Sequence, residues 1–316
     1  WCKKKGIEKL FLAHHLDDQV ETFLMRLGKG SGVDGLAVMN FVTETYSLKL
    51  VRPFLEITKN RLIKILDISN LKWISDPTNF NTNYKRSRIR KILPILSEEG
   101  INSKQIGLVI KRMRAAKDAL NNQTVILLEK YLSNVDNVAY FLDKNLLEEA
   151  TEKEILLRIL EKIFMNISGS IYPPRRNKLE NILSWIIDDN NVTAKTLAGV
   201  VVRKRKSEFI FYREPEDCYK SVNIRPLTSR YSCWDDRFFL KANKSNNLQV
   251  KALGDIGIKI LKEERVLKRQ GLQNVPLSAW KTIPAVWSKK RLISVPTLGY
   301  CKRKDLKIYI KSNKNI

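Results

Sequence analysis

The first part of the chain alternates between strand-like and helix-like hydrophobic patterns. Lys9 to Ala13 is a short apolar run, which predicts a buried strand. From Asp17 to Leu27 the apolar positions recur at helical spacing, which predicts a helix ended by a glycine-rich loop. Leu48 to Val51 predicts a second strand, and Thr58 to Ile68 predicts a second helix with a threonine cap. This order is typical of a parallel α/β sheet covered on both faces.

The middle of the chain has a mostly helical pattern. Apolar positions recur at helical spacing through residues 85–97 and 104–165, and the second stretch is almost free of Gly and Pro. A further helix is predicted over Lys178–Ile187. Residues 196–202 and 208–212 alternate around a basic turn, which predicts a hairpin.

The last part of the chain mixes short strands with a helix near Lys259–Gln270, after a predicted linker at Glu214-Pro215-Glu216. We therefore expect an α/β chain in three parts. These are a Rossmann-like parallel-sheet domain at 1–97, a mostly helical domain ending in a hairpin at 98–216, and a small basic α+β domain at 217–316.

Charge is unevenly distributed along the 316 residues, which contain 58 Lys and Arg against 33 Asp and Glu, a net of +25. Residues 1–97 carry 17 basic and 9 acidic side chains, residues 98–202 carry 14 of each, and residues 203–316 carry 27 and 10. A basic proteome or plain solubility is one explanation. The neutral middle third favours a second explanation, in which the phosphates of a nucleic acid contact the two basic ends of the chain.

Several classes of protein are excluded by the composition. Apolar runs are too short for a membrane span, and the amino end lacks the pattern of a secretory signal. The four cysteines contain no C-x-x-C pair, which argues against a disulfide framework or a cysteine zinc site and favours a reduced, cytoplasmic protein. They are Cys2, Cys218, Cys233 and Cys301.

Reactive side chains are concentrated in the stretch His14-His15-Leu-Asp-Asp-Gln-Val-Glu-Thr22, which holds the only two histidines of the chain. It lies where the first strand passes into the first helix, at the strand end where α/β sheets bind ligands. Asp17, Asp18 and Glu21 share one sector of that helix, where they repel one another unless a divalent cation or a positive substrate neutralises them. Acids also suit a helix start, but that leaves the histidines unexplained.

Two further segments leave alternatives open. The glycine-rich stretch Gly28–Gly35 follows a helix, whereas a phosphate cradle normally precedes one, so it is either a helix end or a mobile loop beside the acidic helix. Arg86 and Arg90 lie on one helical face with Arg88 nearly opposite. Such a run is either solvated charge or a set of bidentate phosphate contacts.

Taken together, these motifs resemble the bacterial tRNA(Ile)-lysidine synthetase family of the ATP-pyrophosphatase superfamily. The resemblance is strongest in the histidine–acid motif and weaker toward the carboxyl end. The matching segments are Leu12–Thr22, Lys29–Gly32, Arg52-Pro53, Asp76–Asn79, Arg86–Arg90, Lys268–Leu272, Pro276, Trp280, Ile283-Pro284 and Leu292–Pro296.

The resemblance implies a two-step reaction on tRNA(Ile) with a CAU anticodon. ATP adenylates the C2 oxygen of the wobble cytidine, and free L-lysine then displaces AMP to form lysidine. Asp18 and Glu21 are expected to position lysine or Mg²⁺, while His14 and His15 shape the site. The expected ATP contacts are Gly30, Ser31, Gly32 and Arg52, and the expected RNA contacts are Arg86, Arg88 and Arg90. The basic domain at 217–316 is expected to bind a more distant part of the tRNA.

The sequence departs from the family pattern in two places. The Ser-Gly-Gly-x-Asp-Ser pyrophosphate loop is absent and the chain starts at Trp1, so we expect an amino-terminally incomplete Rossmann-like domain that binds ATP poorly. Ser87 stands where the family pattern has Asn. The alternatives are a tRNA 2-thiolation enzyme, which would need C-x-x-C cysteines, and a non-catalytic basic RNA-binding protein. The division of roles between the carboxylates stays open, as does a homodimer.

Overall fold

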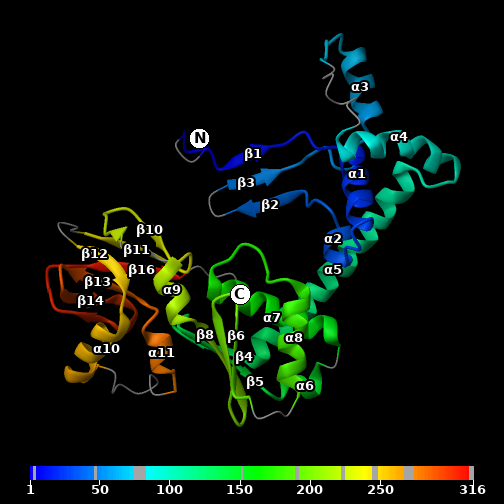
Figure 1. Ribbon diagram of the computed structural model, residues 1–316. Coiled ribbons are helices and arrows are strands. Elements are labelled where there is room, and N and C mark those ends of the chain that lie inside the picture. The colour runs from blue at the N-terminus through cyan, green and yellow to red at the C-terminus, as the bar shows by residue number, and fades with distance from the viewer. Residues whose placement is uncertain are drawn as a thin grey trace. The chain divides into compact units, whose positions relative to one another are not determined.

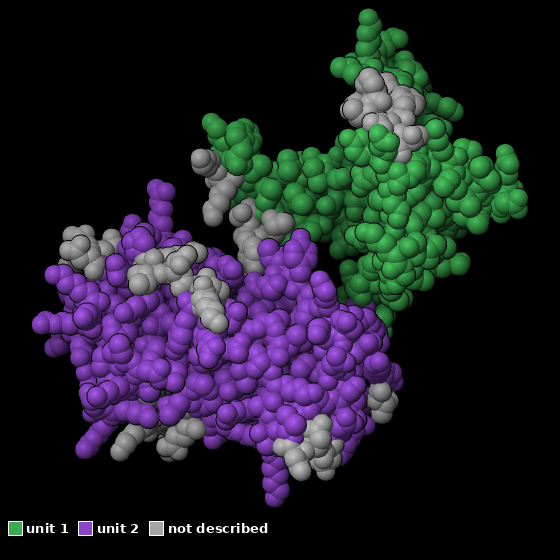
Figure 2. Space-filling view, in the orientation of Figure 1, with its two compact units in different colours: residues 1–121 green, residues 122–316 purple. Residues whose placement is uncertain are grey.

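The computed structural model describes residues 1–2, 5–45, 48–74, 83–150, 152–188, 192–221, 225–243, 248–266 and 274–312. These residues form two compact units, residues 1–121 and 122–316 (Figure 2). The motif segments Asp76–Asn79 and Lys268–Leu272 lie outside the described residues. The expected α/β fold class is confirmed, with a PP-loop domain first, helices in the middle and a strand-rich carboxyl-terminal part.

The sheet of the first unit has the strand order β1-β3-β2 (Figure 1). Strands β1 (Lys9–Phe11) and β3 (Leu48–Val51) are parallel, as predicted, whereas β2 (Val42–Thr45) is antiparallel to β3. The expectation that the first strand is buried is wrong, because all residues of β1 are exposed. Since β1 is an edge strand in the described part of the sheet, only β3 lies beside it.

Helices of the first unit begin and end close to the predicted residues. Thr58 caps α3, where its Oγ1 accepts a hydrogen bond from the Arg61 amide at 3.4 Å. Val20 and Phe23 of α1 pack against Ile106 and Ile110 of α5, which fixes the histidine–acid motif on a packed helix. The helices are α1 (Leu16–Leu27), α2 (Val33–Leu36), α3 (Lys59–Ile68), α4 (Lys85–Glu98) and α5 (Ser103–Tyr131).

The second unit contains an antiparallel sheet with the order β4-β5-β8-β7-β6 and helices α6, α7 and α8 beside it (Figure 1). Its strands are β4 (Leu132–Val135), β5 (Ala139–Asp143), β6 (Ala194–Leu197), β7 (Val200–Lys204) and β8 (Glu208–Arg213). Its helices are α6 (Leu146–Glu149), α7 (Lys153–Ser168) and α8 (Arg176–Ile187).

The helical pattern predicted through 104–165 is wrong between α5 and α6, where β4 and β5 form a hairpin. Asp136 and Asn137 both have positive φ angles, 50° and 57°, which turn the chain back on itself. The apolar run that follows is too short for periodicity to separate a strand from a buried helix. The one hairpin that the sequence predicts is confirmed as β7–β8. The first residues of the predicted segment belong to β6, and the chain turns at Ala198-Gly199 before β7.

Strand-rich structure follows in the carboxyl-terminal part, where the predicted linker instead begins helix α9 (Pro215–Ser221). The helix expected near Lys259 is α10 (Gly254–Glu263), and a shorter α11 (Leu277–Trp280) follows. One sheet has the order β10-β11-β16 and another β15-β14-β13-β12-β9. The strands are β9 (Arg225–Pro226), β10 (Ser232–Trp234), β11 (Phe238–Ala242), β12 (Gln249–Ala252), β13 (Pro284–Ser288), β14 (Arg291–Val295), β15 (Tyr300–Cys301) and β16 (Ile308–Ser312).

One apolar core extends across position 216, where the sequence predicts a domain boundary. It joins Phe141 and Ile210 of the β4–β8 sheet with Trp280 and Trp287 of the carboxyl-terminal part. Burying apolar surface in a shared core makes the folding of both sides interdependent. Among the described residues, every helix is too short or too polar to cross a membrane.

Cys218 of α9 is expected to resist alkylation in the folded protein. Burial, with a smaller contribution from the neighbouring Asp235 carboxylate, raises the pKa of its thiol to about 12. Because the thiolate is the nucleophile, almost none is present at pH 8. Iodoacetamide followed by mass spectrometry should label the exposed Cys301 and leave Cys218 unmodified until urea unfolds the protein. Equal labelling of both thiols under native conditions would contradict the buried placement.

Candidate functional site

The histidine–acid motif lies between the end of β1 and the first turn of α1. His15 is the residue before the helix and has an extended backbone, with φ −120° and ψ 179°. Its amide donates a hydrogen bond to Asp18 Oδ2 at 3.0 Å, and its Nε2 lies 3.5 Å from the same oxygen. Asp18 therefore caps the start of α1, and the same carboxylate oxygen faces the imidazole of His15.

Both histidines have a buried ring nitrogen available for a further contact. Among the described residues, neither Nδ1 of His14 nor Nδ1 of His15 has a hydrogen-bond partner, although His15 Nδ1 lies 3.6 Å from Asp17 Oδ2. A buried polar atom without a partner costs free energy, so such atoms commonly meet a ligand or water. This is the feature of the motif that best fits a binding site.

Asp17 has a structural position that the sequence did not indicate. Its Oδ2 accepts a hydrogen bond from the Lys59 amide at 2.7 Å, and its Oδ1 accepts one from Ser103 Oγ at 3.2 Å. It thus ties α1 to the first residues of both α3 and α5, where a negative charge also suits the helix dipoles. Its Oδ2 also lies 3.6 Å from His15 Nδ1, so Asp17 both ties the helices together and faces the imidazole of the motif.

Glu21 is bound by an arginine from another helix. Its side chain is only 2% exposed, and its Oε1 accepts a hydrogen bond from Arg90 Nε at 2.5 Å. Arg90 Nη2 donates to Oε2 at 3.3 Å, so both carboxylate oxygens are occupied. The hydrogen bond with Glu21 raises the pKa of the Arg90 guanidinium against the opposing effect of burial. The pair holds α4 against α1 and neutralises a buried charge.

The other two arginines of α4 lie differently. Arg86 and Arg88 are exposed, whereas Ser87 and Ile89 between and beside them are buried. Arg88 Nη1 donates to the Asn83 carbonyl at 2.9 Å, close to the helix start. The predicted arginine set is therefore divided between a surface pair and one residue that contacts the motif.

The predicted nucleotide-binding residues lie on the loop before α2 and directly after β3. Gly30 has a φ of +68°, which favours glycine, and Ser31 and Gly32 lead into α2. Arg26 Nη1 holds this loop by donating to the Gly35 carbonyl at 2.7 Å. Arg52 is buried and its Nη1 donates to the Asn40 carbonyl at 3.0 Å and to Thr43 Oγ1 at 2.8 Å. Its contacts stabilise the chain that enters β2, and a role in ATP binding stays a prediction.

Sequence reasoning missed a second pairing that positions the motif. Gln19 is buried, and its Nε2 donates to the Leu55 carbonyl at 2.8 Å. Arg114 of α5 donates through Nη2 to Gln19 Oε1 at 3.2 Å and to the Met39 carbonyl at 2.8 Å. Gln19 belongs to the motif and could have been suspected, but nothing local in the sequence singles out Arg114.

The side chains expected to hold Mg²⁺ already accept hydrogen bonds within the described part of the chain. Both oxygens of Glu21 accept from Arg90, and Asp18 Oδ2 accepts from the His15 amide. In the described part of the chain, no three His, Cys, Asp or Glu side chains converge on one point. A metal ion at Glu21 would have to displace Arg90, so we assign no chemical step to a metal.

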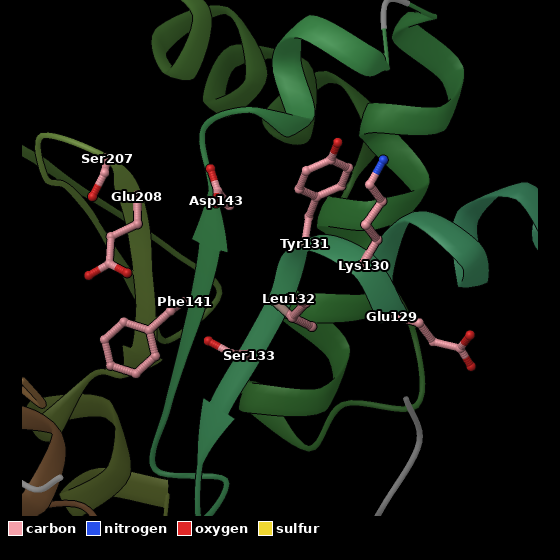
Figure 3. Close-up of a pocket in the computed structure, with 9 residues that line it drawn as sticks. All are labelled: Glu129, Lys130, Tyr131, Leu132, Ser133, Phe141, Asp143, Ser207 and Glu208. Atoms are coloured by element: carbon pink, nitrogen blue, oxygen red, sulfur yellow. The ribbon is translucent and has the colours of Figure 1, made fainter.

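A groove of about 340 Å³ in the second unit is lined by none of the predicted site residues. Figure 3 shows Asp143 and Glu208 on the neighbouring strands β5 and β8, with Ser207 beside them. Lys130 and Tyr131, at the end of α5, both hydrogen-bond Glu149. The groove is polar and contains side chains that already pair within the protein.

The first unit is similar to a known domain. A family model described as a PP-loop domain matches residues 1–96, which include α1 and most of α4. The fold and the motif therefore define a protein with a PP-loop domain.

Curated relatives extend the similarity beyond that domain. The tRNA(Ile)-lysidine synthase of Wolbachia sp. subsp. Brugia malayi is 33% identical over 238 residues, which are 75% of this chain and 55% of that protein. The tRNA(Ile)-lysidine synthase of Ruegeria pomeroyi is 30% identical over 299 residues, covering 95% of this chain and 68% of that protein. The tRNA(Ile)-lysidine synthase of Wolbachia pipientis wMel is 29% identical over 306 residues, covering 95% of this chain and 68% of that protein. The chain belongs to the tRNA(Ile)-lysidine synthase family, and the matched region spans 55% to 68% of the length of these relatives.

Proposed function

We propose that this chain is a tRNA-modifying ligase that uses ATP to attach free lysine to the wobble cytidine of tRNA(Ile) with a CAU anticodon. The observation that carries the proposal is the histidine–acid motif at the strand–helix junction of a PP-loop domain, in a chain of this family. In the first step the C2 oxygen of the cytidine attacks the α-phosphorus of ATP and releases diphosphate. In the second the lysine amine attacks C2 and AMP leaves.

The motif offers groups suited to the second step. Asp18, partly exposed and beside His15, can attract the lysine ammonium group. The amine must lose a proton before it attacks, and a neutral imidazole or a carboxylate can accept it. His14 and His15 are candidates for this role, because the buried Nδ1 of each has no hydrogen-bond partner among the described residues. Glu21 contributes by positioning, because Arg90 holds both of its oxygens.

The first step places extra negative charge on phosphate oxygens, which cations stabilise. Arg86 and Arg88 are exposed on α4, the helix that Arg90 joins to the motif, so they are the proposed contacts for RNA or nucleotide phosphates. Gly30, Ser31 and Gly32 remain the proposed ATP contacts on the loop after α1. Mg²⁺ remains an expectation from the family resemblance alone.

Full-length protein is expected to incorporate labelled lysine into a tRNA(Ile) transcript in an ATP-dependent reaction. The control transcript carries uridine in place of the wobble cytidine and should remain unlabelled, because the acceptor base is missing. AMP should form in equal amount to the incorporated lysine. Labelling from a sulfur donor in place of lysine would instead indicate a 2-thiolation enzyme. Tight tRNA binding without AMP formation would indicate a non-catalytic RNA-binding protein.

A further inference from the structure

Strands β10, β11 and β16 form one sheet of the carboxyl-terminal part (Figure 1). One face of this sheet is apolar, and the other carries lysine and aromatic side chains. Phe238, Leu240 and Ala242 of β11 point into a buried core, together with Trp234 of β10. Since side chains alternate along a strand, the residues between them lie on the opposite face. That face carries Cys233, Phe239, Lys241, Tyr309 and Lys311.

Lysines and tyrosines lie against one another across this face. Lys241 is opposite Tyr309 and Phe239 is opposite Lys311 in the register of β11 with β16. Lys241 Nζ lies 4.7 Å from the ring centroid of Tyr231, the residue before β10, and 5.0 Å from that of Tyr309. Lys311 Nζ lies 4.9 Å from the Tyr231 centroid. We call Tyr231, Phe239, Lys241, Tyr309 and Lys311 the lysine–tyrosine face.

The charges of this face are not neutralised within the protein. Among the described residues, neither Lys241 nor Lys311 has a carboxylate within ion-pair distance, 4.0 Å, and Arg230 and Lys307 nearby in sequence are exposed. Contact with an aromatic ring orients an ammonium group without removing its charge. The tyrosine rings also stay accessible, with Tyr231 39% exposed and Tyr309 47% exposed. The face therefore offers to a partner two oriented cations and two partly exposed tyrosine side chains that have lysines over their rings.

We propose that the lysine–tyrosine face binds RNA at unpaired nucleotides, an inference that rests on the proposed RNA substrate. Phosphates would meet the ammonium groups of Lys241 and Lys311, and a base would stack on the open part of Tyr231 or Tyr309. A paired base has its faces covered by its neighbours, so only an unpaired base can use the rings. An acidic protein segment would satisfy the lysines but leave the rings unused.

Binding of a labelled single-stranded RNA 12-mer and of a blunt RNA duplex of equal length tests this proposal, without ATP or lysine. The double variant Lys241→Gln/Lys311→Gln is expected to weaken binding of both RNAs and to reduce the slope of log single-strand affinity against log salt by about 1.4, which is about 0.7 for each lost phosphate contact. The double variant Tyr231→Leu/Tyr309→Leu should weaken single-strand binding about tenfold and duplex binding less than about twofold. Tyr309→Trp keeps a stacking ring and should bind single strands about as tightly as the unmodified protein.

A charge-matched control is Lys259→Gln/Lys262→Gln, which changes two exposed lysines on α10. It should alter binding less than the face variants do, and thermal melting should show that every variant is folded. The proposal would be overturned if the tyrosine variant bound the single strand as tightly as the unmodified protein does. It would also be overturned if that variant lost equal affinity for the single strand and for the duplex. A third contradicting result would be a control variant that weakens RNA binding as much as the face variants do. Because the assay contains neither ATP nor lysine, failure of lysidine formation and failure of this surface are observed separately.

Discussion

Replacing Asp235 with Asn is expected to lower the free energy of unfolding by about 3–5 kcal/mol, because it removes one partner of a buried ion cluster. The Asp235 side chain is 3% exposed and lies between two buried arginines. Arg237 Nε donates to it at 2.6 Å, and Arg213 Nη2 lies 3.3 Å from Oδ1. Asp217 also pairs with Arg213, so the variant leaves Arg237 as the arginine with the larger uncompensated charge.

The backbone conformation at residue 235 suits both Asp and Asn, so this substitution tests the charge of the side chain. Asp235 has a φ of 52°, a backbone conformation that Asn adopts as readily as Asp. The neighbouring Asp236 has a φ of 49° but is exposed, so Asp236→Asn is the matched control. Urea unfolding followed by tryptophan fluorescence should show a change within about 0.5 kcal/mol for the control. A similarly small change for Asp235→Asn would show that the ion cluster contributes little to the free energy of unfolding.

The same variant reports on the boundary predicted at position 216. Arg213 belongs to β8, while Arg237 directly precedes β11 and its Nη2 donates to the Thr282 carbonyl. Hydrogen exchange should therefore speed up on both sides of residue 216, in β5 and β8 as well as in β13. Loss of protection confined to residues after 216 would indicate that the carboxyl-terminal part folds by itself. Truncation at 216 cannot answer this, because it would expose the shared core.

Local patterns in the sequence were sufficient for most helices of the first unit. The spacing of Val20 and Phe23 and the cap at Thr58 depend on neighbours within one or two turns, and α1 and α3 follow them closely. The β4–β5 hairpin could not be predicted from spacing, because its apolar run is short and its strands gain stability from pairing with β8.

Long-range contacts explain what the sequence left undecided about the site. The motif was located from its residue types, because reactive groups at a strand–helix junction are a local signal. The partner of Glu21 is 69 residues away, and Arg90 already had a separate explanation as a phosphate contact. Asp17 was grouped with two other acids by helical spacing, although it accepts hydrogen bonds from residues of α3 and α5. Sequence spacing places side chains on a helix and cannot identify what packs against them.

The Glu21–Arg90 pair is expected to respond unequally to loss of each partner. Arg90→Ala leaves a carboxylate that is 2% exposed without its cation, which should cost about 3 kcal/mol or more of unfolding free energy. Glu21→Gln leaves a guanidinium that is 33% exposed and can be solvated, so about 1–2 kcal/mol is expected. Arg86→Ala, on the exposed part of the same helix, should change stability by less than about 0.5 kcal/mol.

Lysine incorporation separates a functional role of Glu21 from a purely structural one. At a temperature where Glu21→Gln is fully folded, the rate of incorporation into tRNA(Ile) should fall by about 100-fold or more if the carboxylate positions lysine or its proton acceptor. Raising the lysine concentration should recover part of the rate if Glu21 acts in binding, which a loss of folding alone would not produce. Unchanged incorporation would remove Glu21 from the site and leave the pair as a clamp between α1 and α4. The His15–Asp18 contact, which does not depend on Arg90, would then carry the chemistry of the motif.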